Sequence, residues 1–333
     1  MKLVLVGDVM LGRLVNEELK RESPKLPWGD TLPIFKNADL RICNLECVLS
    51  DVGEPWPNKT FHFRTDEKNI QTLLAAEIGM VSLANNHALD YGHEALLRMM
   101  KILGENAINY AGIGPNFLEA AEPAICRVNS QKVGLLAFTD NEPDWEAKEN
   151  KPGLFYVPID PDSIGVDARD KRAQYLFELI QKTRDDVDLL IVSAHWGPNW
   201  GYSPPKEHIA FAHLLIDSGA DIIFGHSPHV FRGIELYKDK PIFYSCGNFI
   251  DDYAVDEIER NDESFVFLLE TKKSGVTKLQ LYPTLIANFQ AKKAHSEDAR
   301  RIGLLMQKLS SELGTPSQWN RAKEMLEIQM TMN

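Results

Sequence analysis

Cysteine is scarce in this chain, and a long apolar run is missing from it. The 333 residues include four cysteines, none in a Cys-x-x-Cys pair and all in or beside apolar runs: Cys43, Cys47, Cys126 and Cys246. This pattern favours reduced thiols in a cytosolic protein over a disulfide framework. No run approaches the roughly 20 apolar residues of a membrane span, and the segment before Asp8 is too short and too soon charged for a secretory signal. We therefore expect a cytoplasmic protein without a membrane anchor.

An excess of positive charge is also absent. The formal net charge is −12 at pH 7, which argues against a nucleic-acid backbone or an anionic membrane as the main partner. An acidic protein can still bind an anionic substrate where metal ions reverse the local field. We therefore expect a small-molecule, peptide or anionic-polymer substrate and no nucleic acid. No pattern in the chain indicates an oligomeric state.

Short apolar runs alternate with amphipathic stretches, and this alternation is typical of an α/β fold. The apolar runs predict strands at Leu3–Val6, Leu40–Leu45, Met80–Leu83, Val133–Phe138, Leu189–Ser193 and Ile222–Phe224. Apolar residues at helical spacing predict helices at Glu67–Glu77, His93–Asn106, Lys171–Thr183 and Lys206–Ser218.

The pattern changes after Val230. Successive antiparallel strands are predicted at Ile234–Tyr237, Ile242–Ser245, Phe265–Leu269 and Leu279–Tyr282, with a tight turn at residues 238–240. Two sheets with helices outside them fit this pattern better than one parallel sheet. From about Ser296 the chain reads as a charged helical tail, so we expect a main domain at residues 1–295 and a helical extension at 296–333.

Polar residues follow the first three predicted strands. Asp8 ends the first one, where a metal ligand and a helix N-cap are both reasonable interpretations. Asn44 and Glu46 end the second, and the strand period of two places them on one face. The third is followed by Asn85-Asn86-His87, with Asp90 completing the loop, and a polar turn before a helix is the plainer alternative.

Three more histidines follow later strands. His195 ends the strand at 189–193, where a single His is most often a hydrogen-bonded core residue. His226 and His229 follow Ile222–Phe224, and the Ser-Pro turn between them lets both imidazoles point the same way. Imidazole is the commonest side-chain metal ligand. The pair therefore predicts a metal site and raises the question of its other ligands.

Together these residues form a ligand set that suits two divalent cations. The set contains an Asp, a Glu that can bridge, a carboxamide oxygen and three imidazoles, six ligands at the ends of five strands. Such donors accept Mn, Fe, Zn or Mg. Two metals roughly 3.5–4 Å apart can activate a nucleophile and stabilise the oxyanion of an in-line displacement.

Seven short segments resemble one family in residue type and in order. They are Gly7-Asp8-Val9-Met10-Leu11, Asn44-Leu45-Glu46, Phe63-Arg64, Leu83-Ala84-Asn85-Asn86-His87, His195-Trp196-Gly197, Gly225-His226-Ser227-Pro228-His229-Val230 and Tyr244-Ser245-Cys246-Gly247-Asn248-Phe249. The chain resembles the calcineurin-like metallophosphatase superfamily, specifically its CapA branch of poly-γ-glutamate capsule synthesis proteins. The resemblance covers residues 1 to about 290.

The resemblance implies a four-layer α-β-β-α sandwich with metals at the sheet edges. It also implies roles for individual residues. Asp8 and His229 would hold the first metal, Glu46 would bridge, and the second metal would be held by Asn86, His195 and His226. His87 would be the general acid or oxyanion stabiliser, with Asp90 orienting it.

One position departs from the superfamily pattern. The first superfamily motif is Asp-x-His, and the position of that His is Met10 here. A thioether is a poor ligand for hard cations, so the first metal lacks one ligand. The CapA branch shares this Met, which indicates altered chemistry within the branch rather than decay.

Substrate contacts are expected from four residues, and two of them, Arg64 and Trp196, have a structural alternative. The four are Asn44, Arg64, Trp196 and Arg232. Arg64 could clamp a carboxylate or phosphate or form a strand-end salt bridge. Trp196 and Trp200 could wall a pocket or pack in the interior, and for Arg13 the structural alternative is favoured.

Three functions from different classes fit these residues. The leading one is a metal-dependent hydrolase of an ester or amide, such as a γ-glutamyl polymer, with a dinuclear site and His87 as general acid. The second is metal-assisted peptide epimerisation or isomerisation, suggested by the missing His of the first motif. The third is a non-catalytic component of poly-γ-glutamate capsule synthesis.

Overall fold

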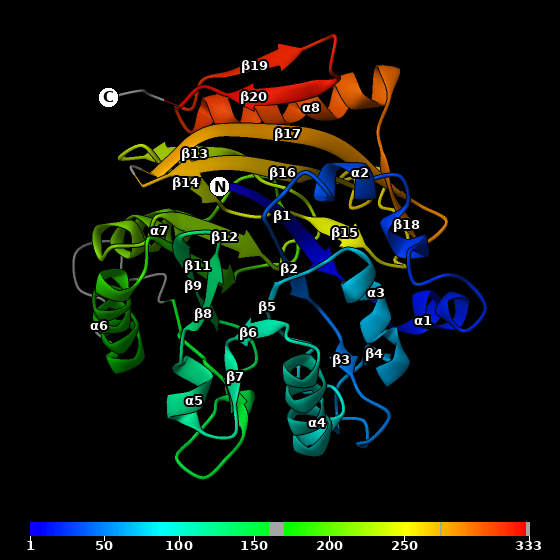
Figure 1. Cartoon of the computed structure of the whole chain (residues 1–333), viewed down its shortest axis with the longest axis vertical. Coiled ribbons are helices and arrows are strands. Elements are labelled where there is room, and N and C mark those ends of the chain that lie inside the picture. The colour runs from blue at the N-terminus through cyan, green and yellow to red at the C-terminus, as the bar shows by residue number, and fades with distance from the viewer. Residues whose placement is uncertain (160–169, 274, 331–333) are drawn as a thin grey trace.

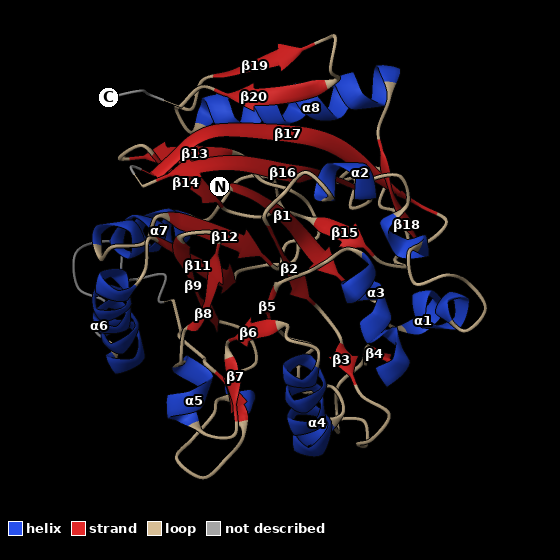
Figure 2. Ribbon diagram, in the orientation of Figure 1, coloured by secondary structure: helices blue, strands red, loops and turns tan. Residues whose placement is uncertain are grey.

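The computed structural model describes residues 1–159, 170–273 and 275–330. It shows a mixed α/β protein (Figures 1 and 2), as the alternation of apolar and amphipathic segments predicts. The helices are α1 (Arg13–Leu19), α2 (Leu32–Phe35), α3 (Ile70–Ala75), α4 (Gly92–Glu105), α5 (Phe117–Ala121), α6 (Lys171–Asp186), α7 (Lys206–Asp217) and α8 (Ser296–Glu312).

The larger sheet has ten strands and carries both ends of the chain. Its main path runs β19 (Ser317–Asn320), β20 (Met325–Ile328), β17 (Gly275–Ala287), β16 (Glu263–Lys272), β1 (Lys2–Val9), β2 (Leu40–Leu45), β5 (Met80–Ser82) and β6 (Asn109–Ala111). Two short strands join it, β15 (Asn248–Ile250) on β1 and β18 (Gln290–Lys293) on β17. The strands β1, β2, β5 and β6 are parallel, so their carboxyl ends lie at one edge.

The smaller sheet has six strands. Its order is β13 (Ile234–Tyr237), β14 (Lys240–Phe243), β12 (Ile222–His226), β11 (Leu189–His195), β9 (Gln131–Thr139) and β8 (Ala124–Val128). The neighbours β9, β11, β12 and β14 are parallel. Two further pairs of short strands lie outside both sheets, β3 (Val48–Leu49) with β4 (Arg64–Thr65) and β7 (Ile113–Gly114) with β10 (Gly153–Leu154).

One apolar cluster joins the two sheets. It includes Leu5 of β1 and Phe267 of β16 from the larger sheet, together with Ile191 of β11 and Phe224 of β12 from the smaller one. On the opposite faces, α1, α3 and α4 pack on the larger sheet, and α6 and α7 pack on the smaller one (Figure 1). The burial of these apolar faces fixes how the strand ends of the two sheets meet.

Most predicted elements are present with small shifts at their ends. The strand at Leu40–Leu45 is β2 as predicted, and the predicted helix at Glu67–Glu77 begins with a 3₁₀ turn at Glu67–Asn69 before α3. The predicted turn joins β13 to β14. Its Lys238 and Asp239 have φ of 52° and 61°, as a type I′ turn requires.

The C-terminal tail differs from the prediction of a helical extension. Residues 296–312 form α8, but the chain then forms β19 and β20, and β20 pairs with β17 of the larger sheet. The prediction of an entirely helical tail is therefore wrong, because sheet pairing determines the structure of 317–328. Residues 331–333 of that tail lie outside the described residues, and the boundary after residue 295 stays a prediction.

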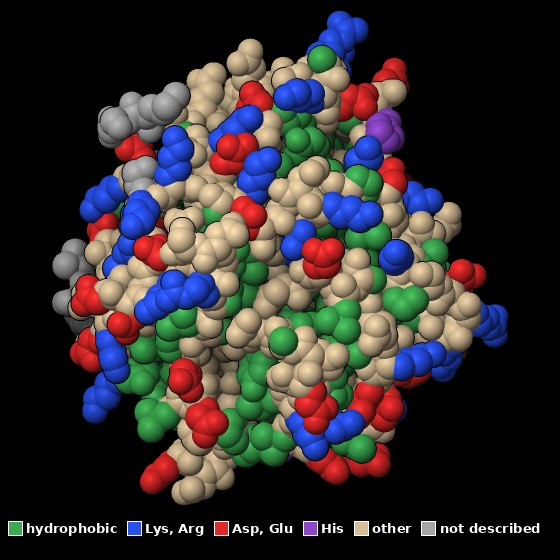
Figure 3. Space-filling model, in the orientation of Figure 1, with side chains coloured by type: hydrophobic (Ala, Val, Ile, Leu, Met, Phe, Trp, Pro, Cys, Tyr) green, Lys and Arg blue, Asp and Glu red, His purple; other side chains and the backbone are tan. Residues whose placement is uncertain are grey.

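The surface shows mixed charge on the face drawn in Figure 3, where acidic and basic side chains lie among one another rather than in separate fields.

None of the helices in the described part of the chain combines the length and apolarity that crossing a membrane requires.

The contact of β1 with β15 allows no side chain at Gly7. A Cβ atom there would lie 1.8 Å from the carbonyl oxygen of Gly247, the same oxygen that accepts the amide of Asp8 at 3.0 Å. We expect Gly7→Ala to lower the free energy of unfolding by about 1–3 kcal/mol or more through overpacking, as measured by urea unfolding. Gly104→Ala in α4 is the matched control, since no heavy atom lies within 4 Å of its Cβ, and it should raise stability by about 0.5–1 kcal/mol. Equal effects of the two substitutions would contradict this account.

Candidate metal centre and active site

The centre forms where the carboxyl ends of the parallel strands of both sheets meet. In the larger sheet, Asp8 of β1 is in register with Asn44 of β2 on one side and Asn248 of β15 on the other. In the smaller sheet, His195 and His226 are register partners at the ends of β11 and β12. Neighbouring parallel strands present register partners on the same face. Two short rows of polar side chains therefore converge.

Asp8, His195 and His226 form a group with the spacing of a metal site. Each contributes a ligand atom, these atoms lie within 4.8 Å of one another, and all three residues are buried. The Nδ1 atoms of the two imidazoles are 2.8 Å apart, and Ser193 Oγ lies 2.6 Å from Nε2 of His226. A hydroxyl that accepts the Nε2 proton makes Nδ1 of His226 the acceptor of its ring, and this lone pair faces Nδ1 of His195.

Unpaired buried atoms at the same place fit a cation. Oδ2 of Asp8, Oδ1 of Asn86 and Nε2 of His195 have no hydrogen-bond partner among the described residues. Buried polar atoms without partners are rare because no hydrogen bond offsets the free-energy cost of removing them from water. Carboxylate and amide oxygens with imidazole nitrogens are suitable ligands for a divalent transition metal. The residues present therefore fit a metal ion.

The buried acids of this centre hold protons more tightly than usual. Burial raises the pKa of Asp8 to about 6, against hydrogen bonds from Glu46 and Asn44 that favour its carboxylate. Burial also raises the pKa of Glu46 well above its ordinary value, and the charge of Asp8 adds to the shift. Ionising both neighbouring carboxyl groups without a cation would cost free energy, because their negative charges repel each other.

The imidazoles are shifted in the opposite direction. Burial lowers the pKa of His226 to about 3 and that of His195 well below its usual range, where the neighbouring His226 adds to the effect. The pKa of His229 is also lowered by burial, although a contact with Asn248 opposes the shift. All three are therefore neutral near pH 7, the state in which imidazole binds a metal.

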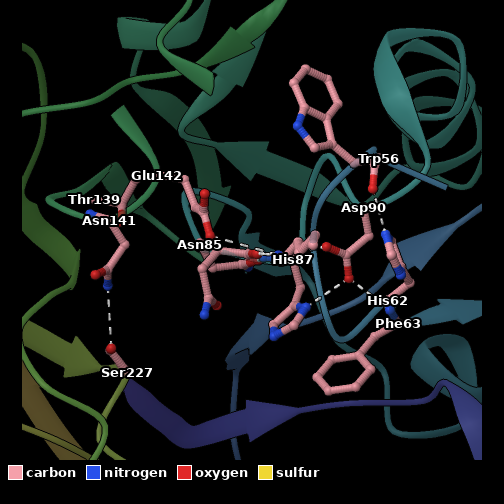
Figure 4. A network of polar contacts seen from close by, with 12 residues as sticks. Trp56, His62, Phe63, Asn85, His87, Asp90, Thr139, Asn141, Glu142 and Ser227 are labelled. Atoms are coloured by element: carbon pink, nitrogen blue, oxygen red, sulfur yellow. Dashed lines mark hydrogen bonds and ion pairs between the residues drawn. The ribbon is translucent and has the colours of Figure 1, made fainter. Parts of the chain in front are cut away.

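His87 is held by a network of polar contacts (Figure 4). Its Nδ1 lies 2.6 Å from Oδ2 of Asp90, and its ring stacks on Phe63 with 3.9 Å between centroids. The backbone amide of Phe63 donates to the same Asp90 oxygen at 2.6 Å. Lys59 donates to the other oxygen of Asp90 at 2.6 Å and also contacts the carbonyl of Asn86.

This network leaves one nitrogen of His87 for a substrate. His87 lines a cavity, and Asp90 occupies its Nδ1, so Nε2 is the available atom. Burial lowers the pKa of His87 to about 4, and the charge of Asp90 offsets only part of that shift. Without a metal the imidazole is therefore neutral at pH 7.

A line of amides connects His87 to the metal ligands. Asn44 donates to Oδ1 of Asp8 at 2.8 Å, and Asn85 donates to Oδ1 of Asn44 at 3.0 Å. The backbone amide of His87 in turn donates to Oδ1 of Asn85 at 3.0 Å. Since Asn44 and Asn85 are fully buried, these bonds fix the spacing between Asp8 and His87.

A cavity of about 500 Å³ opens beside these groups. Its lining combines imidazoles, cationic side chains and aromatic rings, including Arg13, Lys59, Phe63, His87, Trp200 and His229. Such a lining suits an anionic ligand with apolar segments. The cavity thus joins the metal ligands to a surface that can bind substrate.

The four predicted substrate contacts lie elsewhere. Asn44 is fully buried between Asp8 and Asn85. Arg64 stacks over Tyr91 at 4.2 Å, and the fully buried Trp196 stacks on His208 at 5.1 Å. Arg232 is 1% exposed and donates to the carbonyls of Trp200 and Gly201. The structure brings none of the four to the cavity, so their substrate role stays a prediction.

Other residues of the centre have little sequence signal. Lys59 lies in a loop between Pro57 and Phe61 without a recognisable motif, and only the fold brings it to Asp90. Asn248 belongs to one of the matching segments, but its contact with His229, 3.2 Å from Oδ1 to Nδ1, depends on β15 joining β1. Asp251 and Tyr253 follow β15, and Tyr253 lines the cavity.

Two named bacterial proteins are similar to this chain over most of its length. It is 32% identical to the "Probable polyglutamine synthesis accessory protein" of Mycobacterium tuberculosis, with 93% of this chain and 91% of that protein covered. It is 29% identical to the "Capsule biosynthesis protein CapA" of Bacillus anthracis, with 98% of this chain and 77% of that protein covered.

Similar solved structures are below 25% identity and therefore show the fold alone. A hypothetical protein from Thermus thermophilus has a TM-score of 0.52 at 15% identity, covering 85% of this chain and 98% of that one. A putative 5'-nucleotidase from Staphylococcus aureus, solved in complex with α-ketoglutarate, has a TM-score of 0.51 at 16% identity, covering 94% of this chain and 58% of that one. The chain thus shares its fold with these two proteins.

The family described as "Bacterial capsule synthesis protein PGA_cap" matches residues 2–253. That range includes every residue of the candidate centre from Asp8 to Tyr253. With the relatives above, the match confirms the resemblance that the short segments indicated. The chain belongs to the PGA_cap family of bacterial capsule synthesis proteins, the family of CapA.

Proposed function

We propose that this protein is a metal-dependent hydrolase of an ester or amide, built on a four-layer α-β-β-α sandwich. One observation carries the proposal. The buried group of Asp8, His195 and His226 is joined through Asn44 and Asn85 to the oriented imidazole of His87, and His87 lines a cavity. A cation site alone would not need an oriented, uncoordinated imidazole beside it.

The proposed centre holds two divalent cations, of Mn, Fe, Zn or Mg. Asp8 and His229 are the proposed ligands of the first and Glu46 the bridge, while the second is assigned Asn86, His195 and His226. When bound, the cations would polarise the scissile group, activate water and stabilise developing negative charge. The unpaired atoms of Asp8, Asn86 and His195 support this assignment.

The protein's own groups would orient the reaction. Asp90 fixes the His87 ring by its bond to Nδ1, so that Nε2 faces the leaving group. Lys59 fixes Asp90 from the other side. A general acid or base held this way contributes about 10²–10⁴-fold to rate.

The cavity supports an anionic substrate such as a γ-glutamyl polymer. Arg13 and Lys59 supply positive charge, and Phe63 and Trp200 supply apolar surface for methylene groups. The names of two relatives, a polyglutamine synthesis accessory protein and a capsule biosynthesis protein, favour a polymeric substrate of this general kind.

The first prediction concerns metal binding and pH. At Mn²⁺ 100-fold above Kd, binding should add about 2.7 kcal/mol of stability, which is a rise in Tm of roughly 4 °C for a chain of this length. The rise should be larger at pH 7.5 than at pH 5. The pKa of Asp8 is about 6, so at pH 5 a cation must displace its proton. Thermal unfolding at both pH values, with and without a chelator, measures the difference.

Two histidine variants make that prediction specific. His226→Gln removes a proposed ligand and should abolish most of the Mn²⁺-dependent rise in Tm. His213→Gln should retain it, because His213 is partly exposed and lies 2.8 Å from Glu235, away from the centre. A rise of equal size in both variants would rule out His226 as a ligand.

The next prediction concerns His87. With Mn²⁺ bound, His87→Gln should lower kcat/KM by about 10²–10⁴-fold without changing the number of bound ions. The assays are release of nitrophenol from bis-p-nitrophenyl phosphate and of nitroaniline from γ-glutamyl-p-nitroanilide, followed by cleavage of oligo-γ-glutamate. His93→Gln, on α4 against Trp56, is the control and should stay near wild type. Equal inactivity of wild type and His87→Gln on all three substrates would refute the hydrolase.

A second candidate is favoured by the neutral state of His87. An imidazole with a pKa of about 4 has a free lone pair at pH 7, and such a group can accept a proton from a Cα atom next to a polarised carbonyl. This chemistry would make the protein a peptide epimerase or isomerase. In ²H₂O, a γ-linked oligoglutamate would then gain deuterium without cleavage, and absence of exchange would exclude this function.

A third candidate is a non-catalytic role in poly-γ-glutamate synthesis, which the relatives' names allow. A component of that kind needs no metal. Elemental analysis of the purified protein separates it from both enzymes, because retention of about two ions per chain is expected only of the latter.

A further inference from the structure

The side chain of Met10 is buried and engaged within its own loop. Met10 is 1% exposed, and its Sδ accepts a hydrogen bond from the backbone amide of Gly12 at 3.0 Å. The sulfur is therefore both a soft donor and already engaged within its own loop. The first cation of the proposed centre lacks a ligand at this position.

The chain that follows β15 runs beside Met10. Strand β15 is parallel to β1, with Val9 paired to Ile250, and the amide of Met10 donates to the carbonyl of Ile250 at 2.9 Å. The next residue after Ile250 is Asp251. Register alone thus places an acidic residue next to the position where the superfamily motif has its histidine.

The carboxyl group of Asp251 has one engaged and one free oxygen. Asp251 is 4% exposed, and its Oδ1 accepts the backbone amide of Tyr253 at 3.0 Å. Its Oδ2 is buried and has no hydrogen-bond partner among the residues that the structure describes. Tyr253 in turn packs edge-on against His229, with 5.2 Å between centroids. The free oxygen therefore lies in the segment that contacts a proposed ligand of the first cation.

The electrostatics of this segment agree with a cation there. Burial raises the pKa of Asp251 to about 7, and the charges of Asp252 and Asp8 raise it further. The charge of Asp251 also contributes to the raised pKa of Glu46. Three buried acids thus act on one another, and a divalent ion would relieve their mutual repulsion.

We propose that Asp251 supplies the oxygen ligand of the first cation that Met10 cannot supply. The inference rests on the proposed metal centre and specifies its composition. Asp8, Glu46 and Asp251 would give the first position three carboxylates and His229 a single imidazole, with Asn248 holding that ring at 3.2 Å. Such a donor set favours a hard cation, Mn²⁺ or Mg²⁺, over Zn²⁺.

The test compares two neighbouring acids. Asp251→Asn removes the negative charge of the proposed ligand with little change in shape. Asp252→Asn is the matched control, since the Asp252 side chain is also buried but faces α1, accepting the amide of Leu14 at 2.9 Å and pairing with Nε of Arg13 at 3.2 Å. The full-length chain is stripped with a chelator, titrated calorimetrically with Mn²⁺ and analysed for bound metal after gel filtration.

We expect two Mn²⁺ ions on the wild-type chain and on Asp252→Asn. Asp251→Asn should keep one ion at unchanged Kd and bind the other at least about 10-fold more weakly. Binding of two ions by Asp251→Asn with wild-type affinity would overturn the inference alone. Loss of both ions from Asp251→Asn, or loss of one from Asp252→Asn, would also overturn it. A wild-type chain that binds no Mn²⁺ would instead refute the proposed function on which the inference rests.

A measurement on the wild type covers the case in which Asp251→Asn does not fold. Crystals soaked in Mn²⁺ give anomalous density that locates each ion. An ion at a coordination distance of about 2.0–2.6 Å from an Asp251 oxygen would establish the ligand. A first ion bound only by the other proposed ligands would exclude it.

Discussion

The cost of burying charge at the strand ends governs the arrangement of this molecule. Asp8 and Glu46 are each 2% exposed, and His195 and His226 lie at the ends of two strands with almost no exposure. The protein supplies only part of the hydrogen bonds these groups need, as the unpaired atoms of Asp8 and His195 show. A centre of this kind lowers the stability of the empty protein and raises its affinity for a cation.

Much of the remaining polar structure holds this centre at fixed spacing. Asn44 and Asn85 form the amide line between Asp8 and His87, and both are completely buried. The carboxylate of Asp90 accepts hydrogen bonds from Lys59, from the backbone amide of Phe63 and from Nδ1 of His87, each at 2.6 Å. Because these groups lie on β2 or on loops anchored by β5 and β4, the imidazole and the metal ligands form one rigid unit. Preorganisation of this kind allows fixed groups to act without reorganisation during reaction.

The sequence predicted the strand ends well because buried parallel strands are short apolar runs followed directly by polar residues. The string Leu40–Leu45 followed by Glu46 shows this, and β2 has those bounds. The same logic collected the polar residues from which the family resemblance assigned six ligands. It did not find Lys59 or Asp251, whose positions depend on loop path and on β15 joining β1.

The pattern of apolar and polar residues could not predict the direction of individual side chains or the pairing of strands at the sheet edge. Arg64 and Trp196 belong to segments that resemble the family, yet Arg64 stacks on Tyr91 and Trp196 is buried in the interior. The residue type alone does not determine which face of a segment is buried in the fold. The strand Ser317–Asn320 is polar, so no apolar run marks it. It is a strand because β20 pairs with β17 and leaves an edge beside it.

The position of β1 has a consequence for biosynthesis. Its neighbours are β2 on one side and β15 and β16 on the other, with Lys2 paired to Glu270 across most of the chain. A ribosome delivers residues in order, so the first strand emerges long before two of its three partners. The pairing of β1 that positions Asp8 therefore stays incomplete until residues beyond 270 have left the exit tunnel. Pairing between strands so far apart in the sequence is also slow. The metal centre is thus among the last parts of the protein to assemble, although its first ligand is among the first residues made.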